Sequence, residues 1–265
     1  MSINNLSYLE FLNNFANKSK AILIKKFKQK FQFESKDDGS FVTEIDKKIE
    51  DLFINNVKKK FPDHGICGEE FGNFNKNATY VWVIDPLDGT HSFIAGKPLF
   101  GTLICLLVDN IPTLGLIDIP ILNERWLGGI GTGVYFNNKK CSSFKQSKNL
   151  NESIISSTSL LMFKNKYEND IRQIYKKSRF PIFGTDCYAY GLLLSGKIDL
   201  IIEDKMKPWD YLAQVPLINE LGGTISDWSR NDLNLDSKGQ VIASSSKKCY
   251  EEAIKILSSK NKYEL

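Results

Sequence analysis

The segment from Trp82 to Thr90 constrains the fold of this chain more than any other. An apolar run, Tyr80 to Ile84, leads straight into an aspartate-proline pair, and a second aspartate follows three residues after the first. Short runs rich in β-branched and aromatic residues are typical of strands. Pro86 fixes the backbone φ angle and lacks the N–H that a sheet needs, so the sequence predicts that the strand ends here in a turn.

This predicted turn carries candidate chemistry. It would bring the carboxylates of Asp85 and Asp88 and the carbonyl oxygen of Leu87 toward one point. Clusters of such oxygens are the ligands that Mg²⁺ prefers. Gly89 and Thr90 follow with backbone N–H groups that suit a phosphate. The alternative is an ordinary surface turn, because Asp, Pro and Gly are all common in loops.

Helices are predicted on both sides of this segment. Thr43 precedes Asp46 by three residues, an aspartate variant of the helix-capping pattern, and marks the start of the second helix. Apolar spacing and start and stop signals predict helices over Leu6 to Phe31, Glu44 to Phe61, Tyr167 to Lys177, Tyr188 to Leu194, Tyr211 to Leu221 and Lys247 to Leu257.

Strands are predicted in both halves of the chain, at Tyr80 to Ile84, Leu99 to Val108, Thr113 to Asp118, Arg125 to Gly129, Val134 to Phe136, Ile154-Ile155, Pro181 to Phe183, Asp199 to Glu203 and Val241 to Ala243. Mixed strands and helices indicate a layered α/β or α+β architecture. The 265 residues suffice for one large domain or two packed halves. A join near Asn149 to Ser153 predicts an N-terminal half over 1–150 and a C-terminal half over 151–265, forming one functional unit.

Composition excludes several classes of function. The chain is 42% hydrophobic and 25% charged, as in soluble globular proteins, and its net charge of +4 is small and scattered. A nucleic-acid partner is therefore not expected, whereas a phosphorylated substrate would be mildly attracted. The five cysteines contain no C-x-x-C pair, so neither zinc nor a disulfide framework is expected. With no signal peptide and no apolar run of roughly 20 residues, we expect a cytoplasmic protein without a membrane partner.

Two further acidic segments are candidates for the same site. Glu69 and Glu70 lie between two glycines, some 16 residues before Asp85, and Asp210 follows Lys-Pro-Trp at the start of an apolar helix. Each has an ordinary explanation on its own. Paired glutamates are usually solvated, and an aspartate in a first helical turn is favoured by the helix dipole.

The three segments together resemble the inositol monophosphatase superfamily. Glu-Glu, Asp-Pro-x-Asp-Gly-Thr and Trp-Asp with a trailing Gly-Gly occur in that family's order and spacing, and the resemblance covers about residues 6 to 260. It implies a five-layered α/β/α/β/α sandwich, a site between the two halves and a homodimer. It also implies a magnesium-dependent phosphatase that acts on a small phosphorylated metabolite.

The resemblance assigns roles to particular residues. Thr90 would hold the attacking water together with Glu69, Asp46 would orient Thr90, and the Gly89 and Thr90 amides would bind phosphate oxygens. Glu70 would have a supporting role, and Lys36 falls near the family's loop lysine. The ligands of two or three Mg²⁺ ions would be Glu69, Asp85, the Leu87 carbonyl, Asp88 and Asp210.

The physical logic of such a site does not depend on the family. A phosphate monoester is a dianion that bare carboxylates would repel, so metal ions must reverse the sign of the site. Two ions about 3.5 to 4 Å apart can activate water and neutralise the leaving alkoxide. A catalytically silent binding module would retain the fold. However, the four acidic ligands are all present in the sequence.

Substrate choice is predicted to depend on Asp186 and Glu203. Two carboxylates beside a phosphate pocket suit an alcohol with a positive charge. The run Asp186 to Tyr190, with Lys-Pro-Trp-Asp and Asn-Glu-Arg-Trp at 123–126, resembles the histidinol-phosphatase branch, which implies histidinol phosphate as substrate and a place in histidine biosynthesis. An inositol-type monophosphatase with broader substrates is the alternative. Asp186 has a second explanation as the N-cap of the helix near Cys187.

Overall fold

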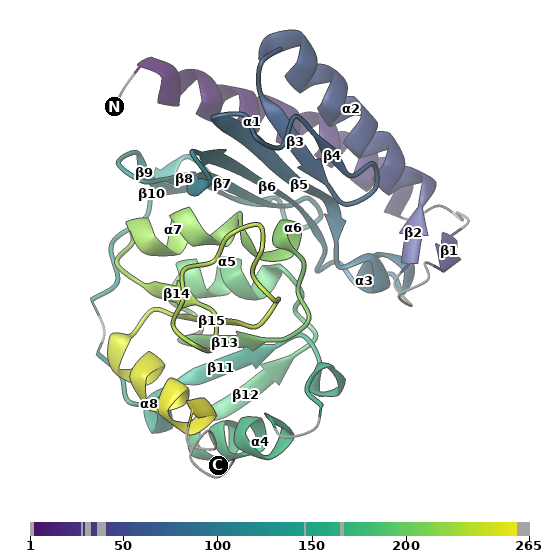
Figure 1. Cartoon of the computed structure of the whole chain (residues 1–265). Coiled ribbons are helices and arrows are strands. Elements are labelled where there is room, and N and C mark those ends of the chain that lie inside the picture. Colours follow the sequence, from purple (N-terminus) through teal and green to yellow (C-terminus); the bar gives the residue numbers. More distant parts are fainter. Residues whose placement is uncertain are drawn as a thin grey trace.

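The protein is built from alternating layers of helices and sheets. A computed structural model describes residues 3–27, 29, 33–35, 41–145, 147–164 and 167–258. Lys36 lies outside the described residues. Five layers follow one another in Figure 1: two long helices, a large sheet, short helices, a smaller sheet and a last pair of helices. The five-layered sandwich predicted from the resemblance is confirmed.

The first layer consists of α1 (Ile3–Phe27) and α2 (Glu44–Lys60), which cover one face of the large sheet (Figure 1). Their apolar faces pack on the sheet in one core, which includes Phe15 of α1, Phe53 of α2 and Trp82 of the strand over Tyr80–Asp88. α2 begins with the predicted capping box, in which Thr43 accepts from the Ile45 N–H and Asp46 accepts from the Thr43 N–H.

The large sheet has eight strands in the order β10-β9-β8-β7-β6-β5-β3-β4. Only β3 and β5 run parallel, and the other neighbours are antiparallel. A separate two-stranded pair, β1 (Phe33–Ser35) and β2 (Phe41–Thr43), precedes α2. The strands of the large sheet are β3 (Gly65–Gly68), β4 (Asn73–Phe74), β5 (Tyr80–Asp88), β6 (Gly101–Val108), β7 (Ile111–Ile119), β8 (Glu124–Gly129), β9 (Gly133–Phe136) and β10 (Lys139–Lys140).

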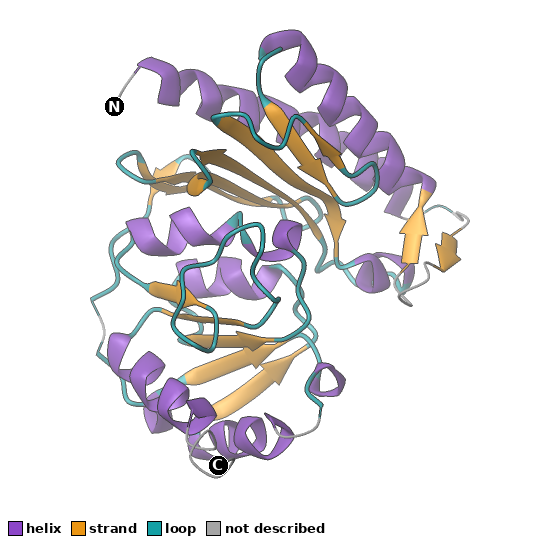
Figure 2. Ribbon diagram, in the orientation of Figure 1, coloured by secondary structure: helices purple, strands orange, loops and turns teal. Residues whose placement is uncertain are grey.

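Short helices separate the two sheets. They are α5 (Tyr188–Leu194), α6 (Pro208–Tyr211) and α7 (Gln214–Glu220), and they share one apolar core with strands of both halves. Figure 2 shows this central helical layer between the two sets of strands. Since each half covers a face of this core, the two halves form one packed unit.

The smaller sheet has five strands in the order β12-β11-β13-β15-β14. Its outer face is covered by α4 (Tyr167–Lys177) and α8 (Lys247–Ser258), which pack with it in a third core. The short elements α3 (Thr90–Ile94), η1 (Leu150–Glu152) and η2 (Leu160–Met162) lie between the larger ones. The strands are β11 (Ile154–Ser157), β12 (Phe180–Phe183), β13 (Leu200–Glu203), β14 (Thr224–Ser226) and β15 (Val241–Ser244).

Two predictions about elements are wrong. The strand from Tyr80 does not end before Pro86 but continues to Asp88. The parallel pairing between β3 and β5 ends at Ile84, so beyond that residue β5 has only β6 as a neighbour. On the side where β3 is absent, the N–H that Pro86 lacks would have made no sheet hydrogen bond. The helix expected over 211–221 is instead divided between α6 and α7. None of the described helices is long and apolar enough to cross a bilayer.

Candidate metal centre

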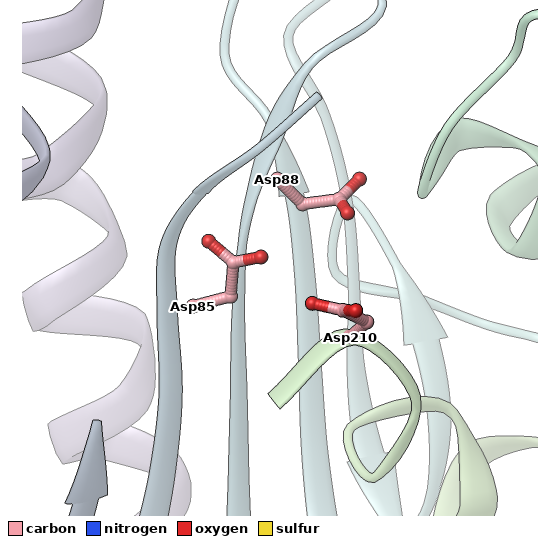
Figure 3. A group of neighbouring side chains, drawn as sticks. All are labelled: Asp85, Asp88 and Asp210. Atoms are coloured by element: carbon pink, nitrogen blue, oxygen red, sulfur yellow. The ribbon is translucent and has the colours of Figure 1, made fainter. Parts of the chain in front are cut away.

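Three aspartates from distant parts of the chain converge between the two halves. Asp85 and Asp88 come from the end of β5, and Asp210 comes from α6. Each places a carboxylate oxygen within 4.8 Å of the others, and Figure 3 shows the three side chains turned toward a common point. The structure thus brings together three of the four acidic residues that the resemblance assigned to metal.

A bulge in β5 makes this convergence possible. Side chains alternate between faces along a strand, so residues three apart would ordinarily point to opposite sides. The pairing with β6 shifts register between Asp85 and Asp88, and such an irregularity re-aims the side chains that follow. Asp85 Oδ1 accepts from the Leu87 N–H at 2.8 Å, which fixes the bulge locally. Pro86 is tolerated in this stretch because β3 no longer pairs with β5 beyond Ile84.

Asp210 is fixed by the start of α6. Its Oδ2 accepts from the Lys207 N–H at 2.7 Å in a capping box, and Pro208 occupies the first turn, where its missing N–H is not needed. The junction after α6 lies directly against the large sheet, because a β-carbon on Gly115 of β7 would stand 2.0 Å from the Ala213 carbonyl oxygen. This close approach brings Asp210 to the β5 carboxylates.

Burial and neighbouring negative charges both disfavour the ionised forms of the three aspartates. Burial, followed by the negative charge of Glu69, raises the pKa of Asp85 well above its ordinary value. Burial, followed by the charge of Asp186, raises the pKa of Asp88 to about 7. The pKa of Asp210 is also raised, by burial and then by Asp88. A cation would relieve this repulsion, and an all-oxygen donor set fits a hard divalent ion such as Mg²⁺.

The remaining predicted catalytic residues lie around the cluster. Glu69 lies close enough for its charge to raise the pKa of all three aspartates. The Thr90 hydroxyl donates to the Leu87 carbonyl at 3.0 Å. Asp46 is buried and makes hydrogen bonds with Thr43, the capping residue of its own helix. Burial chiefly raises the pKa of Asp46 to about 7, and Glu70 and Glu69 contribute.

Gly89, whose N–H is predicted to bind phosphate, also has a conformational role. It adopts a left-handed backbone with φ of 81° immediately before α3, and a β-carbon there would stand 3.3 Å from the Asp186 side chain. Glycine adopts this conformation without strain. The glycine therefore allows the loop that carries Asp186 to lie directly beside the end of β5.

Asp186 faces the cluster and does not cap a helix. The cap position of α5 is Cys187, without a side-chain cap, and Asp186 has a left-handed φ of 45° that turns it away from the helix. The alternative explanation of Asp186 as an N-cap is therefore wrong. Its Oδ2 accepts from the Ser92 hydroxyl at 2.5 Å. The Cys187 N–H donates instead to Asp88 Oδ2, at 2.7 Å.

Glu203 lies at the end of β13, near enough for the charges of Asp88 and Asp186 to act on it. It is buried, and its Oε1 accepts from both the N–H and the hydroxyl of Thr158, at 2.9 and 3.0 Å. Among the described residues, its Oε2 has no hydrogen-bond partner. Burial raises the pKa of Glu203 to about 8, with contributions from the negative charges of Asp88 and Asp186.

Several other residues named in the sequence analysis make contacts that stabilise the fold and lie outside the candidate site. Arg125 pairs with Asp118 and donates to Asn13 and Asn17 of α1, so it ties the sheet to the first helix. Trp126 is buried against Gly191 of α5. Neither belongs to the acidic cluster. Cys105 and Cys187 are buried in the core, as predicted.

Sequence reasoning missed three residues around the site. Ser92 and Thr158 donate to the carboxylates of Asp186 and Glu203, and a lone Ser or Thr gives no signal in a sequence. Glu50 accepts from backbone groups of the Glu69 loop. Its position four residues after Asp46 on the same helix was an available signal, because residues at that spacing share a face.

Comparison with known proteins is consistent with this geometry. The model of the inositol monophosphatase family matches residues 4–262. The bifunctional phosphatase IMPL2, chloroplastic, of Arabidopsis thaliana is 42% identical over 235 residues, which cover 88% of this chain and 68% of that protein. A histidinol-phosphatase of Chlorobaculum parvum is 31% identical over 82% of this chain and 83% of its own.

Solved structures agree. An inositol monophosphatase from Zymomonas mobilis is 33% identical and superposes with a TM-score of 0.85 over 95% of this chain and 97% of that one. Fold and acidic cluster together define a phosphatase of the layered α/β class. The chain belongs to the inositol monophosphatase family.

Proposed function

We propose that this phosphatase hydrolyses histidinol phosphate, in a step of histidine biosynthesis, with Mg²⁺ as cofactor. Histidinol phosphate combines a phosphate monoester with a primary ammonium group. The observation that carries the proposal is a second pair of acids, Asp186 and Glu203, beside the metal cluster. Each has one oxygen held by a hydroxyl group, from Ser92 or Thr158.

The free oxygens of this pair suit an ammonium group. Glu203 Oε2 is buried without a partner, which is unfavourable unless a donor arrives. The loop of Asp186 adjoins the phosphate-binding Gly89, within 3.3 Å of the position of a β-carbon. A cationic donor between the two acids would relieve their mutual repulsion and form charge-assisted hydrogen bonds. A neutral polyol would satisfy the lone pairs but leave the charges uncompensated.

The metal would be held by the residues that the resemblance assigned. When bound, two or three Mg²⁺ ions would supply positive charge for the phosphate and for the leaving oxygen. The ligands would be Glu69, Asp85, the Leu87 carbonyl, Asp88 and Asp210.

The chain's own groups would align the reaction. The Thr90 hydroxyl donates to the Leu87 carbonyl, so its oxygen lone pairs would accept a hydrogen bond from the attacking water. Glu69 would hold the same water, and Asp46 would orient Thr90. The backbone N–H groups of Gly89 and Thr90 would bind phosphate oxygens. Little covalent work by the protein is then required.

Phosphate release by the purified protein in Mg²⁺ tests the proposal. Histidinol phosphate is compared with inositol 1-phosphate, fructose 1,6-bisphosphate and a phosphoadenosine phosphate. We expect kcat/KM at least about tenfold higher for histidinol phosphate, a difference of about 1.4 kcal/mol in transition-state binding. A flat profile would remove the histidine-pathway assignment and leave the phosphatase.

Substitution of Asp186 isolates the role of its charge. Asp186→Asn keeps the size of the side chain and tolerates the left-handed backbone, whereas alanine does so less well. We expect it to lower kcat/KM for histidinol phosphate by about tenfold or more. Turnover of inositol 1-phosphate should change less than threefold. Equal losses on both substrates would contradict the assignment of Asp186 to the ammonium group.

A second candidate is an inositol-type monophosphatase with broad substrates. The observation in its favour is the range of relatives. A fructose-1,6-bisphosphatase/inositol-1-monophosphatase of Thermotoga maritima is 29% identical over 82% of this chain. The same four-substrate assay separates the candidates, because this function predicts either a flat profile or a preference for the neutral polyol phosphate.

A further inference from the structure

A second buried carboxylate on α2 lies one helical turn after Asp46. Glu50 is fully buried, although it is charged in solution. Both of its oxygens are used: Oε2 accepts from the Glu70 N–H and Oε1 from the Phe71 N–H, each at 2.8 Å. A carboxylate that accepts two backbone N–H groups makes strong hydrogen bonds. The Glu50 side chain thus connects α2 to the backbone of a separate loop.

That loop carries Glu69. It connects β3 to β4 and is closed by the Gly68 N–H, which donates to the Gly72 carbonyl at 3.0 Å. A β-carbon on Gly68 would stand 2.0 Å from Glu50 Oε1, so any other residue would displace the carboxylate. The observed position of the Glu50 carboxylate therefore requires glycine at residue 68.

We propose that Glu50 is a positioning residue that holds Glu69 at the metal centre. The proposal rests on the magnesium site of the proposed function. Glu50 would not itself bind the ion, because both its oxygens already accept backbone hydrogens. It fixes the two residues that follow Glu69, and so sets where the Glu69 carboxylate points. Groups that orient ligands in this way affect metal affinity without contacting the ion.

Three variants separate this role from simple stability. Glu50→Gln removes the charge and turns an amide N–H toward one loop donor. Glu50→Asp keeps the charge but is too short to reach both amides. Gly68→Ala displaces the carboxylate without altering it. Asp51→Asn, an exposed position next to Glu50 on the same helix, is the matched control for loss of one charge.

Two measurements are made on the whole protein. Hydrogen exchange of the Glu70 and Phe71 amides is followed without metal, and Mg²⁺ binding is measured by calorimetry without substrate. We expect exchange at least tenfold faster in all three variants than in the control. We also expect the dissociation constant for Mg²⁺ to rise about 10- to 100-fold. Activity at saturating Mg²⁺ should recover in part.

Each outcome bears on the proposal. Unchanged exchange in Glu50→Gln and Gly68→Ala would show that Glu50 does not hold the loop. Faster exchange with an unchanged Mg²⁺ constant would show that the loop is held but does not position a ligand. Either result overturns the proposal. If the unmodified protein binds no Mg²⁺, the proposed function fails instead, and the exchange data still report on the loop.

Discussion

The buried carboxylates of the candidate metal centre oppose folding when no cation is bound. Asp85 is 2% exposed, and its pKa is raised by burial and by the charge of Glu69. Its ionised form is therefore destabilised in the folded chain unless a cation is bound. The residue that is predicted to bind metal therefore weakens the metal-free protein, so its substitution should change both metal-dependent activity and metal-free stability.

Asp85→Asn should lower metal-dependent activity and raise the stability of the metal-free protein. Asn keeps the shape and an oxygen that can accept from the Leu87 N–H. We expect Mg²⁺-dependent phosphatase activity to fall on the order of a thousandfold, since several kcal/mol of charge stabilisation are lost. The metal-free protein should gain about 1 to 3 kcal/mol against urea at pH 8. Lower stability without metal would contradict the repulsion inferred here.

The buried Glu203 predicts a pH dependence. Burial raises its pKa to about 8 in the folded chain, above the ordinary value of 4.5. The folded state therefore retains a proton that the unfolded state loses, so the free energy of unfolding falls as pH rises from about 4.5 to about 8. Glu203→Gln should make this slope less steep in urea titrations with EDTA at pH 5 to 8, while the buried aspartates keep their own contribution. An unchanged slope would show that Glu203 is not the source.

Prediction from sequence succeeded where a signal is local. The bounds of α4 and α5 were predicted to the residue, and the capping box at Thr43 was confirmed. The prediction that the strand ends before Pro86 failed, because a proline breaks a strand only where a neighbouring strand needs its N–H, and β3 does not pair with β5 there. The division between α6 and α7 was missed for a similar reason, since it accompanies contact with β7. The acidic residues were identifiable, but their convergence depends on a bulge and on sheet packing.

The contact between β7 and the α6–α7 junction gives a prediction for an element. Gly115 has no room for a β-carbon, which would stand 2.0 Å from the Ala213 carbonyl oxygen. Gly115→Ala should push the junction away from the sheet and destabilise the protein by about 1 to 3 kcal/mol. Asp210 would move with it, so the Mg²⁺ concentration for half-maximal activity should rise. Normal Mg²⁺ dependence in a destabilised variant would show that the contact serves folding only.

Both halves of the molecule contribute to the candidate metal centre. Asp85 and Asp88 belong to the large sheet, and Asp210 belongs to the helical layer of the second half. An ion held between them would connect the two halves. The homodimer and the domain boundary near residue 150 stay predictions. Light scattering tests the first, with an expected mass of roughly twice the 30.1 kDa chain.

Magnesium should therefore stabilise the whole fold, and more so at higher pH. At about 100 times its dissociation constant, a ligand of the native state adds about 2.7 kcal/mol, or roughly 5 to 10 °C in Tm for a chain of this size. The pKa of Asp88 is about 7, so at pH 6 the ion must displace protons and the increase in Tm should be smaller than at pH 8. Thermal unfolding with and without Mg²⁺ measures both.

Asp210→Asn provides the control for this effect, because it removes the one aspartate of the cluster that comes from the second half. If the ion connects the halves, this variant should lose most of the stabilisation at pH 8. It should also lose the difference between pH 6 and pH 8. A full increase in Tm in the variant would place the bound ion on the first half alone, and the two halves would then be held together by their shared apolar core.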